Sequence, residues 1–422
     1  MNDMTNLEPT ALISRLAADG RAAQRVLARL DSDAKAKALN AAADAISADR
    51  AAILDANAKD IAAGKERGLA DAMLDRLKLD DARLDGIVSA IRNVAQLDDP
   101  VGQVIAGHTA PSGLDLKRVR IPIGLIGIIY ESRPNVTADA AALCVMSGNA
   151  ALLRGGSEAV HSNRAIHAAF AKGLERAGVP AEAVQLIPTQ DRAAVGAMLK
   201  AAGEVDMIVP RGGKSLVARV QDEARVPVLA HLDGICHTYI HASADPEMAK
   251  DIAYNAKLRR TGICGAMETL LIDANFADPA PVLDALAGGG CELRGNDAAQ
   301  KIDNRVKPAT AEDWDTEYLE PVLSVAVVND MDKALEHIAA HSSGHTDAIV
   351  TGDDSAAERF LEEVDSAIVM VNASSQFADG GEFGLGAEIG IATGRLHARG
   401  PVALEGLTTY KWQVRGTGQT RP

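Results

Sequence analysis

The spacing of apolar positions along the chain changes near residue 115. Before about residue 97, apolar residues recur every three or four positions, which is typical of amphipathic helices. Ser32 and Asp33 precede an Ala- and Lys-rich segment and are suitable N-caps for it. The predicted buried face of a later helix consists of Leu84, Ile87, Val88, Ile91 and Ala95. This region carries no obvious chemistry, and we predict a helical scaffold.

Beyond that point, short strand patterns alternate with Ala-rich helical segments. Residues 116–122 alternate between apolar and polar, as an exposed strand does, and residues 124–130 form an apolar run typical of a buried strand. Similar apolar runs follow at 322–328 and 367–372. The alternation predicts an α/β protein with a doubly wound parallel sheet. The tail at 407–414 has a strand pattern too, and together with 116–122 it could pair with another subunit.

Two of the predicted strands end in the same Arg-Gly-Gly sequence and lead into a predicted helix. A glycine turn at a helix N-terminus offers backbone N–H groups to a phosphate, and the arginine adds a forked donor. Either turn alone is more often an ordinary strand-to-helix connection, but two in successive units indicate a nucleotide site. The chain has no GxGxxG or GxxxxGK[ST] sequence. The residues of the two turns are Arg154, Gly155, Gly156, Arg211, Gly212, Gly213, Lys214 and Ser215.

Length and charge narrow the class of protein. A chain of 422 residues predicts two or three domains. The formal net charge of −15 argues against nucleic acid or an anionic membrane as a partner, but it leaves room for an anionic small molecule. The first residues lack the pattern of a signal peptide, and no apolar run is long enough for a membrane span. We therefore expect a soluble, cytoplasmic protein.

Cys264 is the strongest candidate for chemistry. It lies between Gly262 and Gly265, shortly after Arg259 and Arg260. The glycines would expose the sulfur, and the arginines would favour its thiolate form, which is the nucleophile. The alternative is a small buried hydrophobic residue beside a strand. Neither glycines nor arginines help to pack a core, so we prefer a reactive cysteine. Lys257 and the two arginines could guide an anionic substrate or form a solvated basic face.

The remaining cysteines and nearby histidines predict neither disulfides nor metal binding. The four cysteines Cys144, Cys236, Cys264 and Cys291 have no CxxC spacing, which fits a reducing compartment. Cys144 lies in an apolar helical segment and is expected in the core. Cys236, with His231, His237 and His241, matches no standard zinc spacing, and side chains along a strand alternate in direction. We expect no metal.

Several longer motifs are distinctive, at residues 130–137, 153–159, 231–234, 255–257, 313–319, 380–390 and 396–400. Together they resemble the aldehyde dehydrogenase superfamily, and most closely a branch that reduces glutamyl phosphate. The resemblance runs from about residue 10 to the C-terminus. It implies an aldehyde dehydrogenase-like α/β fold, with two doubly wound parallel-sheet domains and a small oligomerisation β-arm. It also implies a cofactor-binding domain at 1–107 and 128–235, a catalytic domain at 236–397, and oligomerisation strands at 108–127 and 400–416.

The resemblance also implies roles for single residues. Cys264 is the expected nucleophile, and Asn135 the expected side-chain donor to the oxyanion. Arg154 lies where the superfamily holds the adenosine ribose, and a cation there suits the 2′-phosphate of NADP(H). Glu317 lies where the nicotinamide ribose is held. Without the resemblance, Asn135 is interpreted as a turn residue and Glu317 as a solvated loop carboxylate.

The implied reaction is NADPH-dependent reduction of L-glutamyl 5-phosphate to L-glutamate 5-semialdehyde and phosphate, through a cysteine thioester, in proline biosynthesis by a homo-oligomer. His231 stands where hydrolytic members place a water-activating glutamate, which fits an enzyme that must not hydrolyse its thioester. The alternative is that His231 itself acts as a base. Thr261 and Gly265 depart from the Pro and Asn frequent in the branch. Two further hypotheses are a hydrolytic NAD(P)-dependent semialdehyde dehydrogenase and a non-catalytic nucleotide-binding protein.

Overall fold

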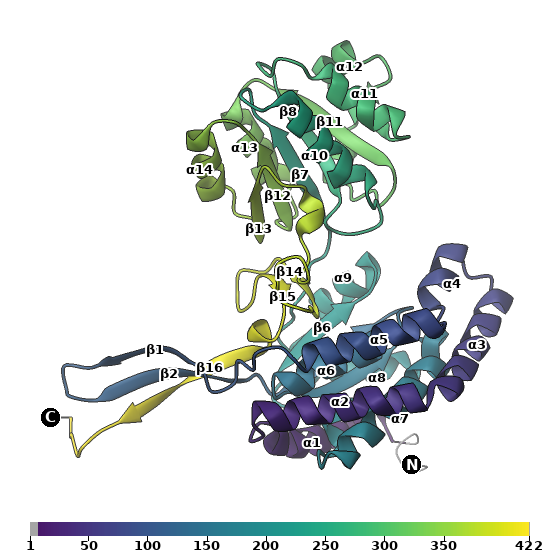
Figure 1. The fold of residues 1–422 in the computed structure, drawn as a ribbon, viewed down its shortest axis with the longest axis vertical. Helices are drawn as coiled ribbons and strands as arrows, with labels where there is room; N and C mark the ends of the chain where they lie inside the picture. The colour runs from purple at the N-terminus through teal and green to yellow at the C-terminus, as the bar shows by residue number, and fades with distance from the viewer. Residues whose placement is uncertain (1–6, 422) are drawn as a thin grey trace. The chain divides into compact units, whose positions relative to one another are not determined.

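The computed structural model describes residues 7–421 and divides the chain into two compact units (Figure 1). Each unit contains a parallel sheet with helices, as the alternating strand and helix patterns predict. The chain crosses between the units more than once, so the second unit is inserted into the first in sequence. The first unit comprises the described residues up to Ala230, Leu385–Gly390 and those from Val402; the second comprises His231–Gly384 and Ile391–Pro401.

Five helices open the first unit, as the helical periodicity predicts. The N-cap of the second helix is Asp31, whose side chain accepts a hydrogen bond from the backbone N–H of Ala34. The prediction of Ser32 or Asp33 as the cap is therefore wrong by one or two residues, because Asp31 has the extended backbone that a cap requires. The predicted apolar face of the fifth helix is buried. The helices are α1 (Pro9–Leu27), α2 (Ser32–Ala48), α3 (Arg50–Glu66), α4 (Asp71–Leu77) and α5 (Asp81–Val94).

A four-stranded parallel sheet with the order β5-β4-β3-β6 forms the centre of the first unit. From β3 the chain proceeds outward to β4 and β5 and then returns past β3 to β6. Ligands of open α/β sheets bind at the carboxyl ends of the strands where the order reverses in this way. The strands are β3 (Leu125–Tyr130), β4 (Ala150–Gly155), β5 (Val184–Leu186) and β6 (Met207–Arg211), with helices α6 (Val136–Met146), α7 (Val160–Arg176), α8 (Arg192–Lys200) and α9 (Lys214–Glu223).

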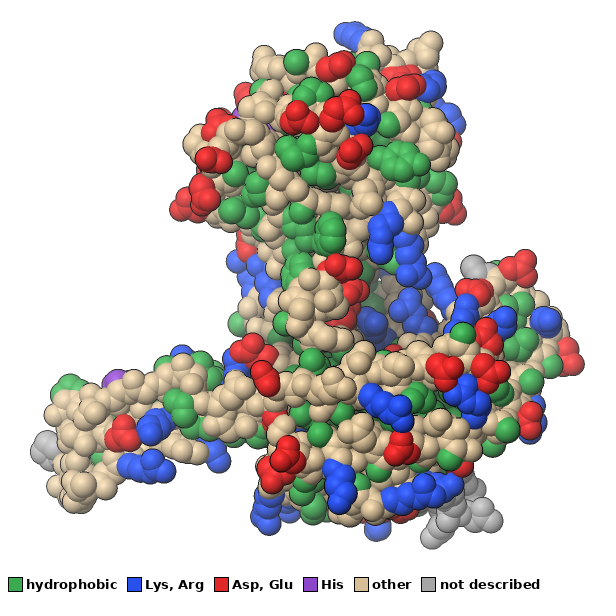
Figure 2. Space-filling model, viewed as in Figure 1, with side chains coloured by type: hydrophobic (Ala, Val, Ile, Leu, Met, Phe, Trp, Pro, Cys, Tyr) green, Lys and Arg blue, Asp and Glu red, His purple; other side chains and the backbone are tan. Residues whose placement is uncertain are grey.

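An antiparallel sheet of three strands projects from this unit as an arm (Figure 1). It consists of β1 (Val104–Thr109), β2 (Asp115–Pro122) and β16 (Thr408–Arg415), in the order β1-β2-β16. Both strands predicted here, at 116–122 and 407–414, are present and pair with each other. Tyr410 and Trp412 are exposed, and Figure 2 shows apolar and basic side chains intermingled on the arm. An outer strand with exposed aromatic residues is suited to pairing with another chain.

A seven-stranded parallel sheet with the order β10-β9-β11-β8-β7-β12-β13 forms the second unit. The predicted strands at 322–328 and 367–372 correspond to β11 and β13. The strands are β7 (Cys236–Ile240), β8 (Met267–Asp273), β9 (Glu292–Gly295), β10 (Lys307–Pro308), β11 (Val322–Val328), β12 (Thr346–Val350) and β13 (Ile368–Val371). The helices are α10 (Pro246–Leu258), α11 (Ala280–Gly288), α12 (Asp297–Ile302), α13 (Met331–His341) and α14 (Asp354–Glu363).

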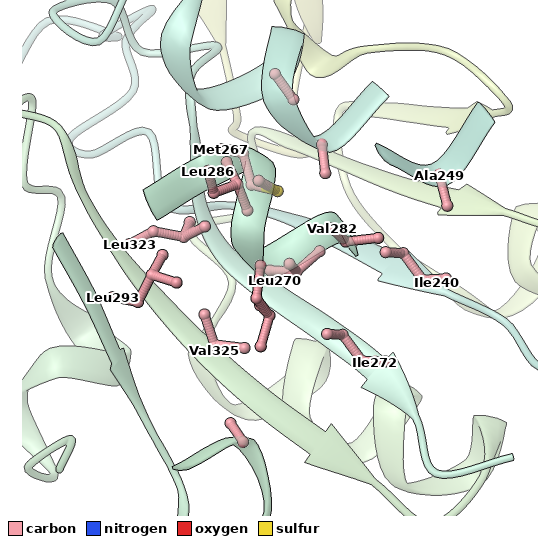
Figure 3. Close-up of a cluster of buried hydrophobic side chains, with 14 of the residues drawn as sticks. Ile240, Ala249, Met267, Leu270, Ile272, Val282, Leu286, Leu293, Leu323 and Val325 are labelled. Atoms are coloured by element: carbon pink, nitrogen blue, oxygen red, sulfur yellow. The ribbon is translucent and has the colours of Figure 1, made fainter. Parts of the chain in front are cut away.

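Helices cover both faces of this sheet: α10, α11 and α12 lie on one face, and α13 and α14 on the other (Figure 1). Leu270 and Ile272 of β8 pack toward Val282 and Leu286 of α11, as Figure 3 shows. Leu271, between them in sequence, belongs to the core on the opposite face. Because both faces are covered, most strand residues are buried, and these include polar ones such as His237 of β7 and Glu268 of β8.

The α/β, doubly wound fold is confirmed. Two further short strands, β14 (Gly390–Ala392) and β15 (Gly400–Val402), pair with each other. No helix within residues 7–421 is long and apolar enough to cross a membrane. The functions assigned to the predicted segments, cofactor binding, catalysis and oligomerisation, stay predictions.

Candidate active site

The amino ends of four adjacent strands gather the candidate catalytic residues of the second unit. Cys264 precedes β8, and His231 precedes β7. Glu317 precedes β11, and His345 immediately precedes β12. The strands are neighbours in the order β11-β8-β7-β12 and are parallel, so their amino ends lie along one edge. Residues more than a hundred positions apart in sequence therefore converge.

Gly234 is the closest backbone neighbour of the cysteine loop. A Cβ atom added to Gly234 would lie 2.2 Å from the carbonyl oxygen of Cys264 and 2.6 Å from its Cα. The backbone N–H of Gly234 donates a hydrogen bond of 3.0 Å to Oε1 of Glu317. Only glycine allows this approach, and Glu317, which is half-buried, holds the glycine segment in place. Glu317 is therefore not a fully solvated loop carboxylate.

Cys264 is the most accessible of the four thiols. It is half-buried, whereas Cys144, Cys236 and Cys291 are buried. Burial raises the pKa of Cys144 and of Cys291 to about 12, and it raises the pKa of Cys236 well above the usual value. The Cys236 thiol donates a hydrogen bond of 3.1 Å to the backbone carbonyl of Cys264. The buried thiols are thus held protonated, and Cys264 is the candidate nucleophile. The predicted core position of Cys144 is confirmed.

Two histidines flank the cysteine. Nδ1 of His231 lies 2.7 Å from the backbone carbonyl oxygen of Ile391. A carbonyl only accepts, so in the neutral ring Nδ1 carries the proton. His345 is completely buried, and its ring centroid lies 5.1 Å from that of His231. Burial, and to a lesser degree His231, lowers the pKa of His345 to about 3. His345 was not predicted from the sequence, because its only signal is its place directly before a strand.

A buried ion pair supports the segment behind the cysteine loop. Lys257 and Glu268 are both completely buried and form a salt bridge. Oε1 of Glu268 also accepts a hydrogen bond of 3.2 Å from the backbone N–H of Leu319. Burial raises the pKa of Glu268 even though Lys257 opposes the shift. Lys257 is therefore a structural residue, and both predictions for it, a substrate guide and a solvated basic face, are wrong.

A pocket of 330 Å³ lies beside this loop within the second unit. Arg259 and Asn255 line it from one side, and Ser374 and Gln376 line it from the other. The Gln376 side chain donates to the carbonyls of Ala256 and Arg260, at 2.8 and 3.1 Å, and so fixes the end of α10. The pocket borders the cysteine loop, because a Cβ atom at Gly265 would lie 3.1 Å from the carbonyl of Ser375. Its exposed guanidinium, at Arg259, suits an anionic group.

In the first unit, the two Arg-Gly-Gly turns lie at the carboxyl ends of β4 and β6, next to β3. Oε2 of Glu131 accepts a hydrogen bond of 3.1 Å from the backbone N–H of Gly213, at the start of α9. Oε1 of Glu158 accepts a hydrogen bond of 2.9 Å from the Ser132 hydroxyl. A Cβ atom on Gly212 would lie 2.5 Å from Oε2 of Glu131. The predicted anion site at Gly213 thus holds the protein's own carboxylate, which a phosphate would have to replace.

Arg154 lies at the end of β4. Its guanidinium donates to the backbone carbonyls of Gly155, at 2.7 Å, and Gln190, at 3.1 Å, while its buried Nε has no partner among the described residues. Burial lowers the pKa of Arg154, and Arg192 adds to this effect through its charge. Two guanidinium groups are therefore close together at this edge. Arg192 was not predicted from the sequence, because its position depends on the connection between β5 and α8.

Asn135 occupies the N-cap position of α6, between β3 and that helix. Its side-chain amide donates a hydrogen bond of 2.8 Å to Oδ2 of Asp139, one turn along α6. Burial raises the pKa of Asp139 to about 6, although Asn135 and Arg211 oppose the shift. The carboxylate therefore orients the amide, and the second amide hydrogen is left for another acceptor. Asn135 shares its unit with the Arg-Gly-Gly turns, and Cys264 shares its unit with His231 and Glu317.

The fold is that of the aldehyde dehydrogenases. The chain belongs to the aldehyde dehydrogenase family, whose model matches residues 9–313 and 285–411. An acetylating aldehyde dehydrogenase of Geobacillus thermoglucosidasius, at 17% identity, shares the fold with a TM-score of 0.68 and covers 98% of each chain.

More similar relatives give a narrower assignment. The gamma-glutamyl phosphate reductase of Novosphingobium aromaticivorans is 71% identical over 413 residues, covering 98% of this chain and 97% of that protein. The one from Zymomonas mobilis is 60% identical and covers 100% of this chain and 99% of its own. The crystal structure of the gamma-glutamyl phosphate reductase of Thermotoga maritima has a TM-score of 0.95 at 43% identity, covering 97% and 100%. The chain therefore falls in the gamma-glutamyl phosphate reductase branch, a group of oxidoreductases, and the predicted resemblance is confirmed.

Proposed function

We propose that the protein catalyses NADPH-dependent reduction of L-glutamyl 5-phosphate to L-glutamate 5-semialdehyde and phosphate, in the cytoplasm, as a step of proline biosynthesis. The observation that carries the proposal is the accessible thiol of Cys264, held against Gly234 and Glu317, in a chain 71% identical to a gamma-glutamyl phosphate reductase. The buried state of the other three thiols supports Cys264 as the reacting group.

In the proposed reaction, the Cys264 thiolate attacks the acyl carbon and the C–O bond to phosphate breaks, which leaves a thioester on the sulfur. The Asn135 amide and a backbone N–H at the cysteine stabilise the oxyanion. NADPH, when bound, supplies the hydride that reduces the thioester. The carbon–sulfur bond then breaks, the aldehyde leaves and the Cys264 thiolate is regenerated. Overall, acyl phosphate, NADPH and a proton give aldehyde, NADP⁺ and phosphate.

Four groups of residues are proposed to hold NADP(H). Arg154, with Arg192 beside it, provides positive charge for the 2′-phosphate. The turn from Arg211 to Ser215 provides backbone N–H groups at the start of α9 for the pyrophosphate, with Glu131 moving away from Gly213. Gly155 and Gly156 allow close approach of the cofactor at β4, and Glu317 is assigned to the nicotinamide ribose. The reversal of strand order beside β3 supports a nucleotide at this edge.

A requirement for phosphate separates the reductase from the hydrolytic alternative. In the oxidative direction, with glutamate semialdehyde and NADP⁺, we expect the rate to depend on added phosphate or arsenate. His231 stands where a hydrolytic enzyme holds its water-activating glutamate, and its neutral ring with Nδ1 bound to Ile391 could serve as a base. An undiminished rate without phosphate or arsenate would establish the hydrolytic reaction instead.

The Cys264→Ser variant tests the nucleophile. We expect a loss of at least about 10³-fold in kcat, because a serine hydroxyl is a much weaker nucleophile than a thiolate near neutral pH. Iodoacetamide labelling followed by intact-mass analysis tests the same residue without turnover: the parent should be labelled at Cys264 first. Activity of the serine variant within tenfold of the parent, or labelling at Cys291 with Cys264 untouched, would contradict the proposal.

We also propose a homo-oligomer that pairs through the β-arm. The outer strands β1 and β16 have neighbours on one side only within the arm, and Tyr410, Trp412 and Val414 are exposed on β16. A Trp412→Lys substitution should lower the molar mass measured by light scattering while the circular dichroism spectrum stays unchanged. An unchanged mass would place the interface elsewhere.

A further inference from the structure

Two histidines and the accessible cysteine of the second unit are close enough to share one metal ion. Sγ of Cys264 and one ring nitrogen each of His231 and His345 lie within 4.8 Å of one another. Zinc binds Cys sulfur at about 2.3 Å and His nitrogen at about 2.0–2.1 Å, so the three ligand atoms of a tetrahedral site are about 3.3–3.6 Å apart. To bring the three ligand atoms from separations of up to 4.8 Å to those of a tetrahedral site, each side chain must move by about 1 Å or less. The cysteine, in a glycine-flanked loop, can make such a movement by rotating about χ1.

The histidines are prepared for this role by their other contacts. His231 points Nδ1 at the carbonyl of Ile391, at 2.7 Å, which leaves the lone pair of the neutral ring on Nε2. His345 has Nδ1 2.9 Å from the Thr346 hydroxyl, and its buried Nε2 has no hydrogen-bond partner within residues 7–421. A buried, unpartnered ring nitrogen is costly and calls for a ligand. Metal-bound histidines typically use their second nitrogen for a backbone or hydroxyl contact of this kind.

The groups around the cluster also favour a metal ion of this kind. The neighbouring thiol of Cys236 is already engaged, because it donates a hydrogen bond of 3.1 Å to the carbonyl of Cys264. Nearby carboxylates are already engaged: Asp347 accepts from Ser342 and Ser366. One thiolate and two imidazoles without a carboxylate suit zinc-like ions rather than Mg²⁺ or Ca²⁺.

We propose that Cys264, His231 and His345 form a binding site for one thiophilic divalent cation of the zinc class, with the fourth coordination position left to water. On binding, the Cys264 thiol loses its proton to solvent and a metal–sulfur bond forms, so the sulfur is blocked both as a nucleophile and as a target of alkylating agents. The binding of the metal does not depend on the catalytic role of Cys264. The further expectation that zinc reversibly inhibits the enzyme rests on the proposed function, because it requires Cys264 to be the nucleophile. The site departs from the expectation, drawn from the sequence, that the protein binds no metal.

Cobalt substitution tests the site spectroscopically, without any assay of turnover. Titration of the whole protein with Co²⁺ should produce a thiolate-to-cobalt charge-transfer band that saturates at one equivalent and disappears when Zn²⁺ is added. Mg²⁺ should leave the band unchanged. Cys264→Ser should abolish the band, and His231→Gln and His345→Gln should each weaken Co²⁺ binding at least about tenfold. Affinity should fall as the pH is lowered, because the thiol must be deprotonated.

Cys291→Ala is the matched control, because it removes a buried thiol outside the cluster and should keep the band. Thermal unfolding without metal shows whether each variant is folded; His231→Gln, at a half-buried position, covers the case in which His345→Gln unfolds. Absence of a band in the parent, a band retained in Cys264→Ser, or parental affinity in the folded histidine variants would overturn the site. If the band behaves as expected while Cys264→Ser stays active, the metal site stands and the proposed catalytic function fails.

Discussion

The contact between Gly234 and Cys264 makes a sharp prediction for the substitution Gly234→Ala. The added methyl group would lie 2.2 Å from the carbonyl oxygen of Cys264 and 2.6 Å from its Cα. Ordinary contacts of this kind are about 3.5 Å, so the cysteine backbone must move by about 1 Å. A displacement of that size in an active site can reduce the rate about 10²-fold, and overpacking costs about 1–3 kcal/mol of stability.

The assay measures kcat in the oxidative direction, the rate of iodoacetamide labelling at Cys264, and the free energy of unfolding. We expect kcat to fall about 10²-fold, with a smaller change in the KM for NADP⁺. Gly288→Ala is the matched control: it lies in the same unit, at the end of α11, with no atom within 4 Å of the added methyl group. If Gly234→Ala keeps kcat within threefold of the parent, the close approach does not position the cysteine and the reasoning is wrong.

Three further outcomes are expected. Asp139→Asn removes the carboxylate that orients Asn135, so kcat should fall about tenfold. The decrease in kcat near pH 6, which titration of Asp139 would cause in the parent, should be absent from the pH profile of the variant. An unchanged profile would exclude this positioning role. Arg154→Leu should raise the KM for NADPH about tenfold and leave that for NADH within twofold; equal effects would mean that Arg154 does not contact the 2′-phosphate. The pKa of His345 is about 3 in the folded protein, so between about pH 6.5 and 5 only the unfolded chain binds a proton at this histidine. The free energy of unfolding should therefore fall by about 2 kcal/mol over this range. Urea unfolding of His345→Gln should show a correspondingly smaller dependence of stability on pH.

Local sequence patterns predicted most of the elements. The buried strand at 124–130 and the runs at 322–328 and 367–372 are strands because their apolar residues are covered on both faces. The cap of α2 was displaced to Asp31, since several polar residues there can cap and only backbone geometry selects one. Cys264 was identified from its neighbours in sequence, and the structure places it as the least buried cysteine.

Long-range contacts account for what the sequence did not predict. Lys257 has the pattern of a surface cation, yet Glu268, eleven residues later, pairs with it in the core. Arg192 lies close to Arg154, and the carboxyl group of Asp139 interacts with Arg211. These neighbours come from other segments of the chain, so the sequence around Arg192 or Asp139 does not predict them. The carboxylate of Glu131 accepts a hydrogen bond from Gly213, where the sequence predicts an anion site, and no pattern around the glycines indicates this contact. Charge pairing between distant segments depends on sheet order, and periodicity does not encode it.

Sheet order also explains why one edge of the second unit carries so much chemistry. Both faces of its sheet are covered by helices, so the strand ends are the places where polar groups of the sheet become accessible. The neighbours β11, β8, β7 and β12 bring Glu317, Cys264, Gly234 and His345 to the same edge, although these residues span more than a hundred positions. Gly234 allows the close approach of the cysteine loop to this edge, and Nε2 of the buried His345 has no hydrogen-bond partner in the part of the chain that the structure describes. The proposed acyl transfer and the proposed metal binding both use the same accessible thiol at this edge. The cobalt titration and the phosphate dependence test these two proposals separately.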